Sequence, residues 1–168
     1  MLQEFKFSQY FFICLFGLSY IYMQYICDFH IHSKYSRATS KDMDIENLDK
    51  WANIKGIQVI GSGDFTHPKW LKELRENLEP VEPGLFKFKK SDSGVRFILT
   101  VEISSIYSKN NRTRKIHNII FAPDFETVEK INAHLGWIGN LKSDGRPILG
   151  LDAKELAKIV LNISGDCL

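Results

Sequence analysis

The sequence predicts an α/β fold for residues 23–168. Short apolar segments alternate along this part of the chain with segments of helical periodicity, and polar turns separate them. This alternation is typical of a largely parallel sheet covered by helices, either open or barrel-like. The composition agrees, because 44% of the 168 residues are hydrophobic and 25% are charged, as in ordinary globular domains. These values exclude disorder, collagen-like structure and a multi-span membrane protein for the chain as a whole.

The first half of this domain is predicted to alternate strand and helix twice. Residues 25–31 form the first strand. Asp44 is placed to cap a helix that runs to about Lys55, with a buried face of Ile45, Leu48 and Trp51 or Ala52. A short apolar strand follows at 57–61. Pro68 suits the first turn of the second helix, whose buried stripe contains Trp70, Leu71, Leu74 and Leu78.

The second half is predicted to contain three strands and two helices. Asp124 caps a helix that runs to about Leu135, and Asp152 opens the last helix with Glu155 in the capping-box position. No repeat, low-complexity run or flexible linker interrupts the series. The three strands, separated by polar turns, lie at residues 85–89, 96–104 and 115–122.

Residues 1–22 are a hydrophobic extension of this domain. No Asp, Glu, Lys, Arg or His occurs from residue 7 to residue 27, a length that could span a bilayer. The run lacks the basic start and the cleavage pattern of a secretory signal, and it overlaps the first predicted strand. We therefore predict an upstream extension of a cytoplasmic domain that begins near Met23, with a membrane anchor as the alternative. A reducing compartment fits the odd number of cysteines, Cys14, Cys27 and Cys167.

Two histidines at the end of the first predicted strand indicate a metal site. His30 and His32 are two residues apart, so on a strand their side chains point to the same face, with Cα atoms about 6.6 Å apart. Two imidazoles in this arrangement can bind one metal ion. The alternative is a pair of solvated histidines on an exposed strand.

Four further residues fall at the ends of predicted strands or within them. Asp64 and His67 directly follow the strand at 57–61, and functional groups gather at the carboxyl ends of such strands. Glu102 lies within an apolar strand, where an ionised carboxylate is costly without a positive partner. That partner could be a metal ion or an arginine. His117 is embedded in another strand, where the alternative is a hydrogen-bonded core histidine.

These residues also carry a resemblance to a known superfamily. Residues 28–36, Asp-Phe-His-Ile-His-Ser-Lys-Tyr-Ser, resemble the opening motif of the polymerase-and-histidinol-phosphatase (PHP) superfamily of metal-dependent phosphoesterases. The order of several later segments is similar to the endonuclease Q group, whose relatives are also described as helicase-associated PHP proteins. Those segments are residues 30–39, 61–70, 96–102, 115–123 and 139–152.

The resemblance implies a PHP-type distorted β/α barrel with two zinc or manganese ions. His30 and His32 match the ligands of the first motif. Glu102 matches the catalytic carboxylate that bridges two ions, and His117 matches a ligand of the second ion. The second motif is expected to supply two further metal ligands, Asp64 and His67. Many PHP proteins have an adjacent Asp-His pair there, whereas two residues separate the pair in this chain.

The substrate implied by the resemblance is DNA with a deaminated base, as a duplex or a single strand. Basic side chains in loops supply candidate phosphate contacts, although such residues are often only solvated. The loop at 143–147 is a further candidate by resemblance alone. The candidate substrate contacts are Lys34, Arg37, Arg112, Arg114, Asp144 and Arg146.

The PHP pattern also contains later ligands, including an Asp-x-His pair, that this chain does not contain through Leu168. We therefore expect residues 23–168 to form the N-terminal part of a longer phosphoesterase domain. Either a second polypeptide completes the open edge of the barrel or the protein is poorly stable. The predicted function is an endonuclease Q-like repair nuclease. The alternatives are a small-molecule phosphomonoesterase and a non-catalytic interaction fragment.

Overall fold

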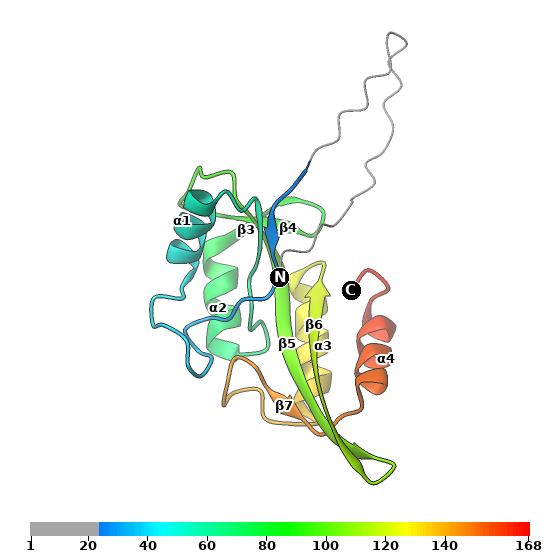
Figure 1. Cartoon of the computed structure of the whole chain (residues 1–168). Coiled ribbons are helices and arrows are strands. Elements are labelled where there is room, and N and C mark those ends of the chain that lie inside the picture. Colours follow the sequence, from blue (N-terminus) through cyan, green and yellow to red (C-terminus); the bar gives the residue numbers. More distant parts are fainter. Residues whose placement is uncertain (1–23) are drawn as a thin grey trace.

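A seven-stranded mixed sheet around one long strand, β5 (Arg96–Lys109), organises the fold (Figure 1). The computed structural model describes residues 24–168, so the predicted extension at 1–22 and its membrane-anchor alternative lie outside the described residues. No helix in the described range is long and apolar enough to cross a bilayer. The other strands are β1 (Cys27–Asp28), β2 (Val59–Gly61), β3 (Leu78–Glu82), β4 (Leu85–Phe88), β6 (Arg112–Ala122) and β7 (Ile148–Leu149).

The sheet combines parallel and antiparallel pairs, which corrects the prediction of a largely parallel sheet. Strands β1, β2 and β5 run parallel, and so do β5 and β7. Strands β3, β4 and β6 are added by antiparallel pairing. Between β5 and β6 the chain reverses through Asn110 and Asn111, whose φ angles of 54° and 57° are those of a two-residue hairpin turn. Such a turn forces the two strands to be antiparallel.

The sheet formed by the described residues is not closed, so the predicted barrel remains a prediction. The strands follow the order β1-β2-β5-β4-β3, with β6 and β7 also paired to β5. The mixed α/β class is confirmed. Strands β3 and β7 were not predicted, and β1 is much shorter than the predicted strand at 25–31.

The four predicted helices are confirmed, and local capping explains where they begin. The carboxylates of Asp44 and Asp124 accept hydrogen bonds from the backbone N–H groups of Asn47 and Thr127, and Asp152 caps the last helix in the same manner. Gly56 ends the first helix with a φ of 70°, as expected for a left-handed cap. The helices are α1 (Ile45–Lys55), α2 (Pro68–Asn77), α3 (Phe125–Gly136) and α4 (Ala153–Ile163).

The helices pack around the sheet, and their buried faces can be compared with the predicted ones. Helix α1 contacts β4 and α2 contacts β3, while α3 packs between β6 and α4 (Figure 1). The sequence left open whether Trp51 or Ala52 completes the buried face of α1. In the structure Ala52 is buried and Trp51 is 52% exposed. The stripe of α2 is buried as predicted at Trp70 and Leu74. Leu71 is half-buried, and Leu78 belongs to β3, because the helix ends at Asn77.

Alternating side chains of β5 divide the sheet into an apolar face and a polar face. Four apolar side chains of β5 are fully buried in the core: Phe97, Leu99, Val101 and Ile103. Because successive side chains of a strand point to opposite faces, the residues between them lie on the other face. On that face Thr100 and Glu102, and also Ser104 after Ile103, are buried. This second face of β5 forms the floor of the candidate site.

Candidate metal centre

The two histidines of the opening segment follow β1 and do not belong to it, because β1 ends at Asp28. Two glycines, one at the end of β2 and one just after it, let this segment approach closely. A β-carbon on Gly61 would lie 2.7 Å from the backbone oxygen of Phe29, and one on Gly63 would lie 2.6 Å from that of Ile31. Gly63 also has a φ of 63°, which favours glycine. The close contact holds the segment against the carboxyl end of β2.

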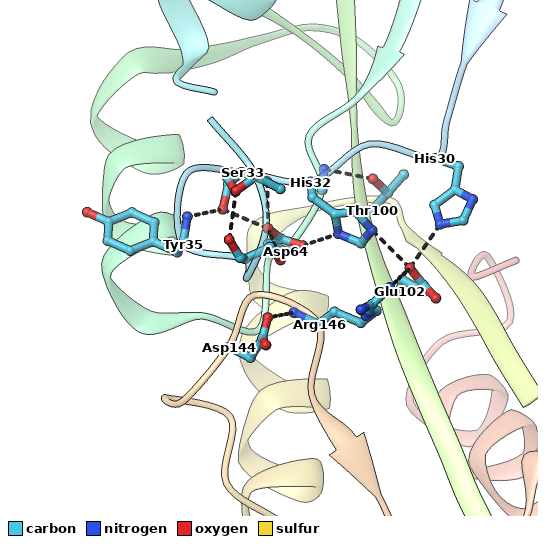
Figure 2. A network of polar contacts seen from close by, with 12 residues as sticks. His30, His32, Ser33, Tyr35, Asp64, Thr100, Glu102, Asp144 and Arg146 are labelled. Atoms are coloured by element: carbon cyan, nitrogen blue, oxygen red, sulfur yellow. Dashed lines mark hydrogen bonds and ion pairs between the residues drawn. The ribbon is translucent and has the colours of Figure 1, made fainter. Parts of the chain in front are cut away.

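Both histidines point at one oxygen of Glu102 (Figure 2). Nε2 of His30 lies 2.9 Å from Oε2 of Glu102, and Nε2 of His32 lies 3.0 Å from the same atom. The donor atoms of the three residues all lie within 4.8 Å of one another. The convergence expected from the spacing of the two histidines is therefore present, although no regular strand carries them.

The other oxygen of Glu102 faces a third histidine. Nδ1 of His117 contacts Oε1 of Glu102, and its Nε2 lies 3.2 Å from the hydroxyl of Ser104. Glu102 is 3% exposed. One of its oxygens faces His30 and His32 and the other faces His117. One carboxylate facing nitrogen ligands on both sides has the arrangement expected of a bridging ligand.

The imidazoles also determine the ionisation of Glu102. Burial by itself would raise the pKa of Glu102, but hydrogen bonds from His30 and His117 outweigh burial and hold this pKa below its ordinary value. The guanidinium of Arg146, 3.7 Å from Oε2, acts in the same direction. Glu102 is therefore an anion at neutral pH, which is the form that binds a cation.

Asp64 lies behind the cluster and holds His32. The Oδ1 atom of Asp64 is 3.0 Å from Nδ1 of His32. Its Oδ2 accepts hydrogen bonds from the backbone N–H of Ser33 and from the hydroxyls of Ser33 and Ser36, at 2.6, 2.7 and 2.9 Å. Asp64 is fully buried and has a φ of 50°, which is unusual for a residue with a side chain. Its hydrogen bond raises the pKa of His32.

His67 lies apart from the other histidines. It is the residue that precedes Pro68 at the start of α2, and its ring stacks on Tyr35 with ring centroids 4.4 Å apart. Its Nδ1 is buried and has no hydrogen-bond partner among the described residues. Burial lowers the pKa of His67. Asp64 and His67, predicted as one pair of ligands, thus occupy two different places beside the cluster.

The loop at 142–147 closes one side of the site. Its Gly145 donates a backbone hydrogen bond to the carbonyl of Tyr35, and its Asp144 accepts a hydrogen bond from the backbone N–H of Arg146 at 3.1 Å. Arg146, a candidate substrate contact, extends from this loop toward Glu102 (Figure 2). The loop therefore brings a cation to the cluster.

The other predicted basic contacts lie farther out. Lys34 forms an ion pair of 2.9 Å with Glu73, and the exposed Arg37 lies 3.4 Å from Asp144. Arg112 and Arg114 are exposed on the β5–β6 hairpin. None of these side chains contacts the His–Glu cluster among the interactions of residues 24–168.

Several residues that build the site did not stand out in the sequence. Ser33 and Ser36 bind Asp64, and Thr100 receives the backbone N–H of Gly63 at 2.9 Å. Gly145 packs directly on Asp64. The two serines belong to the opening motif at residues 28–36, but the motif did not assign them to Asp64. Gly145 lies in the candidate loop at 143–147, but the sequence did not indicate its contact with a segment 81 residues earlier.

The fold and the cluster together define a mixed α/β protein with a candidate divalent-metal site at the strand ends. No protein-family model matches the chain. It is 34% identical over 139 residues to an uncharacterized protein of Methanocaldococcus jannaschii, an alignment that covers 82% of this chain and 15% of the relative.

Among solved structures, the chain is similar to endonuclease Q. It is 33% identical to the lesion-specific endonuclease PfuEndoQ of Pyrococcus furiosus, with a TM-score of 0.71, over 84% of this chain and 32% of that one. The chain is also similar to endonuclease Q in complex with a 27-mer duplex that carries an abasic lesion at the active site, with a TM-score of 0.70 and 33% identity. This match covers 84% of this chain and 33% of that one. The chain spans about a third of these endonucleases.

Proposed function

We propose that this chain carries part of the active site of a metal-dependent DNA endonuclease of the endonuclease Q type. The observation that carries the proposal is the convergence of His30, His32 and His117 on the two oxygens of the buried Glu102. The similarity in sequence and structure to a lesion-specific endonuclease supports the same reading. The PHP superfamily is the class of phosphoesterase that we propose for the domain.

The donor set of the cluster fits divalent metal ions. Neutral imidazole nitrogens and a carboxylate suit zinc or manganese. His30, His32 and Oε2 of Glu102 would hold one ion, while Oε1 and His117 would contribute to a second. When bound, such ions lower the pKa of a water molecule and stabilise negative charge on the oxygens of a phosphoryl group.

The residues around the cluster orient the ligands. Both oxygens of Asp64 are occupied by hydrogen bonds within the protein, so we assign it to holding the ring of His32 and not to direct coordination. With Nδ1 of His32 bound to Asp64, Nε2 remains directed at the cluster. Carboxylates that hold a histidine in this way are common in metal sites and increase the basicity of the ligand.

Arg146 supplies a positive charge for a phosphate oxygen. Its guanidinium approaches Glu102 at 3.7 Å and its side chain is 40% exposed, so it is open to a ligand that enters the site. Guanidinium groups bind phosphate oxygens through charge-assisted hydrogen bonds. We propose that Arg146 binds the non-bridging oxygens of the scissile phosphodiester. Asp144 shapes the loop that carries Arg146.

The proposed substrate is DNA with a damaged base. The similar endonucleases are described as lesion-specific and as bound to a duplex with an abasic lesion. Within this class we propose deaminated bases, uracil and hypoxanthine, as the lesions that this chain acts on. An enzyme that inspects such a base in a duplex must take it out of the stack.

Incubation of the purified chain with Mn²⁺ or Zn²⁺ and end-labelled duplexes tests the proposal. The duplexes contain uracil, hypoxanthine, an abasic site or no lesion. We expect cleavage beside a lesion when a second polypeptide supplies the later part of the domain, and its loss in Glu102→Gln. Glu46→Gln, which changes an exposed glutamate of α1, should cleave like the wild type. Hydrolysis of a chromogenic phosphomonoester alone would contradict the nuclease and favour a phosphomonoesterase, and no turnover of any substrate would favour a non-catalytic fragment.

A further inference from the structure

The β5–β6 hairpin extends away from the helices beyond the candidate site (Figure 1). Residues 108–117, which include the turn, are all exposed. The two strands stay paired out to Lys109 and Arg112, and the tight turn at Asn110 and Asn111 closes the end. The hairpin is therefore a regular arm whose base carries Glu102 and His117.

The pairing register assigns each residue of the arm to one of its two faces. Directly opposite residues of an antiparallel pair lie on the same face, and faces alternate along each strand. Ser104 pairs with His117 and Ile106 pairs with Lys115. Lys115 therefore shares the face of His117 and Glu102, which we call the site face. Its neighbour Arg114, paired with Tyr107, lies on the opposite face.

The two faces differ in charge. Beyond His117, the site face carries Ile106, Ser108, Thr113 and Lys115. These residues supply one cation, two hydroxyl groups and no carboxylate. Lys115 has no acidic partner among the ion pairs of residues 24–168. On the opposite face lie Lys109, Arg112 and Arg114. There Lys109 forms an ion pair of 2.8 Å with Asp152, so that face, unlike the site face, has a carboxylate against it. A cation and hydroxyls without carboxylates are the groups that contact DNA phosphates.

We infer that the site face of the β5–β6 hairpin binds the DNA backbone beside the cleavage site, with Lys115 contacting a phosphate. The inference rests on the proposed function, because it takes DNA as the ligand of the neighbouring cluster. Two residues of a strand span about 6.8 Å, and DNA rises about 3.4 Å per nucleotide along one strand. Lys115 is thus within roughly two nucleotides of a phosphate held at His117.

The faces of the hairpin provide a matched pair of variants. Lys115→Gln and Arg114→Gln each remove one exposed positive charge from adjacent positions of β6, but on opposite faces. Fluorescence anisotropy of a labelled uracil-containing duplex in EDTA measures binding of each full-length variant across a range of salt concentrations. Cleavage of the same duplex with Mn²⁺ is measured separately.

We expect Lys115→Gln to bind more weakly and to depend less on salt. Loss of one phosphate contact reduces the slope of log affinity against log salt by about 0.9, so the fall in affinity between 50 and 200 mM salt becomes about 3.5-fold smaller. Arg114→Gln should keep the wild-type slope, because Arg114, a candidate contact from the sequence alone, lies on the face turned away from Glu102 and His117. Equal slopes for both variants, whether changed or unchanged, would overturn the assignment of the site face.

The two assays separate this inference from the proposed function. If the wild type cleaves the duplex but Lys115→Gln and Arg114→Gln behave alike, the hairpin inference fails and the nuclease stands. If Lys115→Gln alone shows the smaller salt dependence but no protein cleaves, the nuclease fails and the binding surface stands. A wild type that binds no DNA would overturn both.

Discussion

A methyl group at position 145 should destabilise the protein, because Gly145 packs against a buried carboxylate. The β-carbon of Gly145→Ala would overlap the carboxyl group of Asp64 and the hydroxyl of Ser36. Asp64 is fully buried and held by hydrogen bonds to both oxygens, so it has little freedom to move. The loop at 142–147 must then lift away from Tyr35.

The expected cost combines two effects. Forcing an extra methyl group into a packed site costs about 1–3 kcal/mol, and loss of the Gly145 hydrogen bond to the Tyr35 carbonyl adds about 1 kcal/mol. The free energy of unfolding should fall by about 2–4 kcal/mol in total. For a domain of this size the melting temperature should fall by roughly 5–15 °C.

Urea unfolding followed by tryptophan fluorescence measures this loss. Gly150→Ala is the matched control, since a β-carbon there meets nothing within 4 Å, and it should change stability by less than about 0.5 kcal/mol. If Gly145→Ala proves as stable as Gly150→Ala, the loop does not rest on Asp64, and the position that we give to Arg146 would lose its support.

Two further predictions concern residues around the cluster. Asp64→Asn should weaken metal affinity about 10- to 100-fold, because the NH₂ group of the amide cannot accept a hydrogen bond as a carboxylate oxygen does. Competition with a chelator measures this affinity. The hydrogen bond to Glu73 raises the pKa of Tyr35 to about 12, above its ordinary value near 10. A raised pKa stabilises the fold below pH 10, and this contribution is lost as the pH rises toward 12. The difference of about 1 kcal/mol in unfolding free energy between the wild type and Tyr35→Phe should therefore shrink over that interval.

The helices were predictable because their signals are local. Asp44, Asp124 and Asp152 are capping residues within three positions of the N–H groups that they bind, and Gly56 ends α1 by its own conformation. Strand pairing is not local. The sequence showed the polar turn at Asn110 and Asn111, but not that it would join two long antiparallel strands into an arm.

The candidate site was predictable where residue chemistry alone was sufficient. The spacing of His30 and His32 and the apolar surroundings of Glu102 indicated that these side chains meet, and the structure brings them together. The place of His67 was not predictable, since it depends on the backbone turn at Asp64, with its positive φ. The face of each basic residue on the hairpin likewise depends on the register of β5 with β6, which no sequence spacing reveals.

Anomalous diffraction from crystals grown with Mn²⁺ or Zn²⁺ tests the central claim most directly. We predict an ion within about 2.0–2.3 Å of Nε2 of His30, Nε2 of His32 and an oxygen of Glu102, with a second ion on the side of His117. An anomalous signal elsewhere in the protein, or none at saturating metal, would contradict the claim that these imidazoles and this carboxylate form a metal centre.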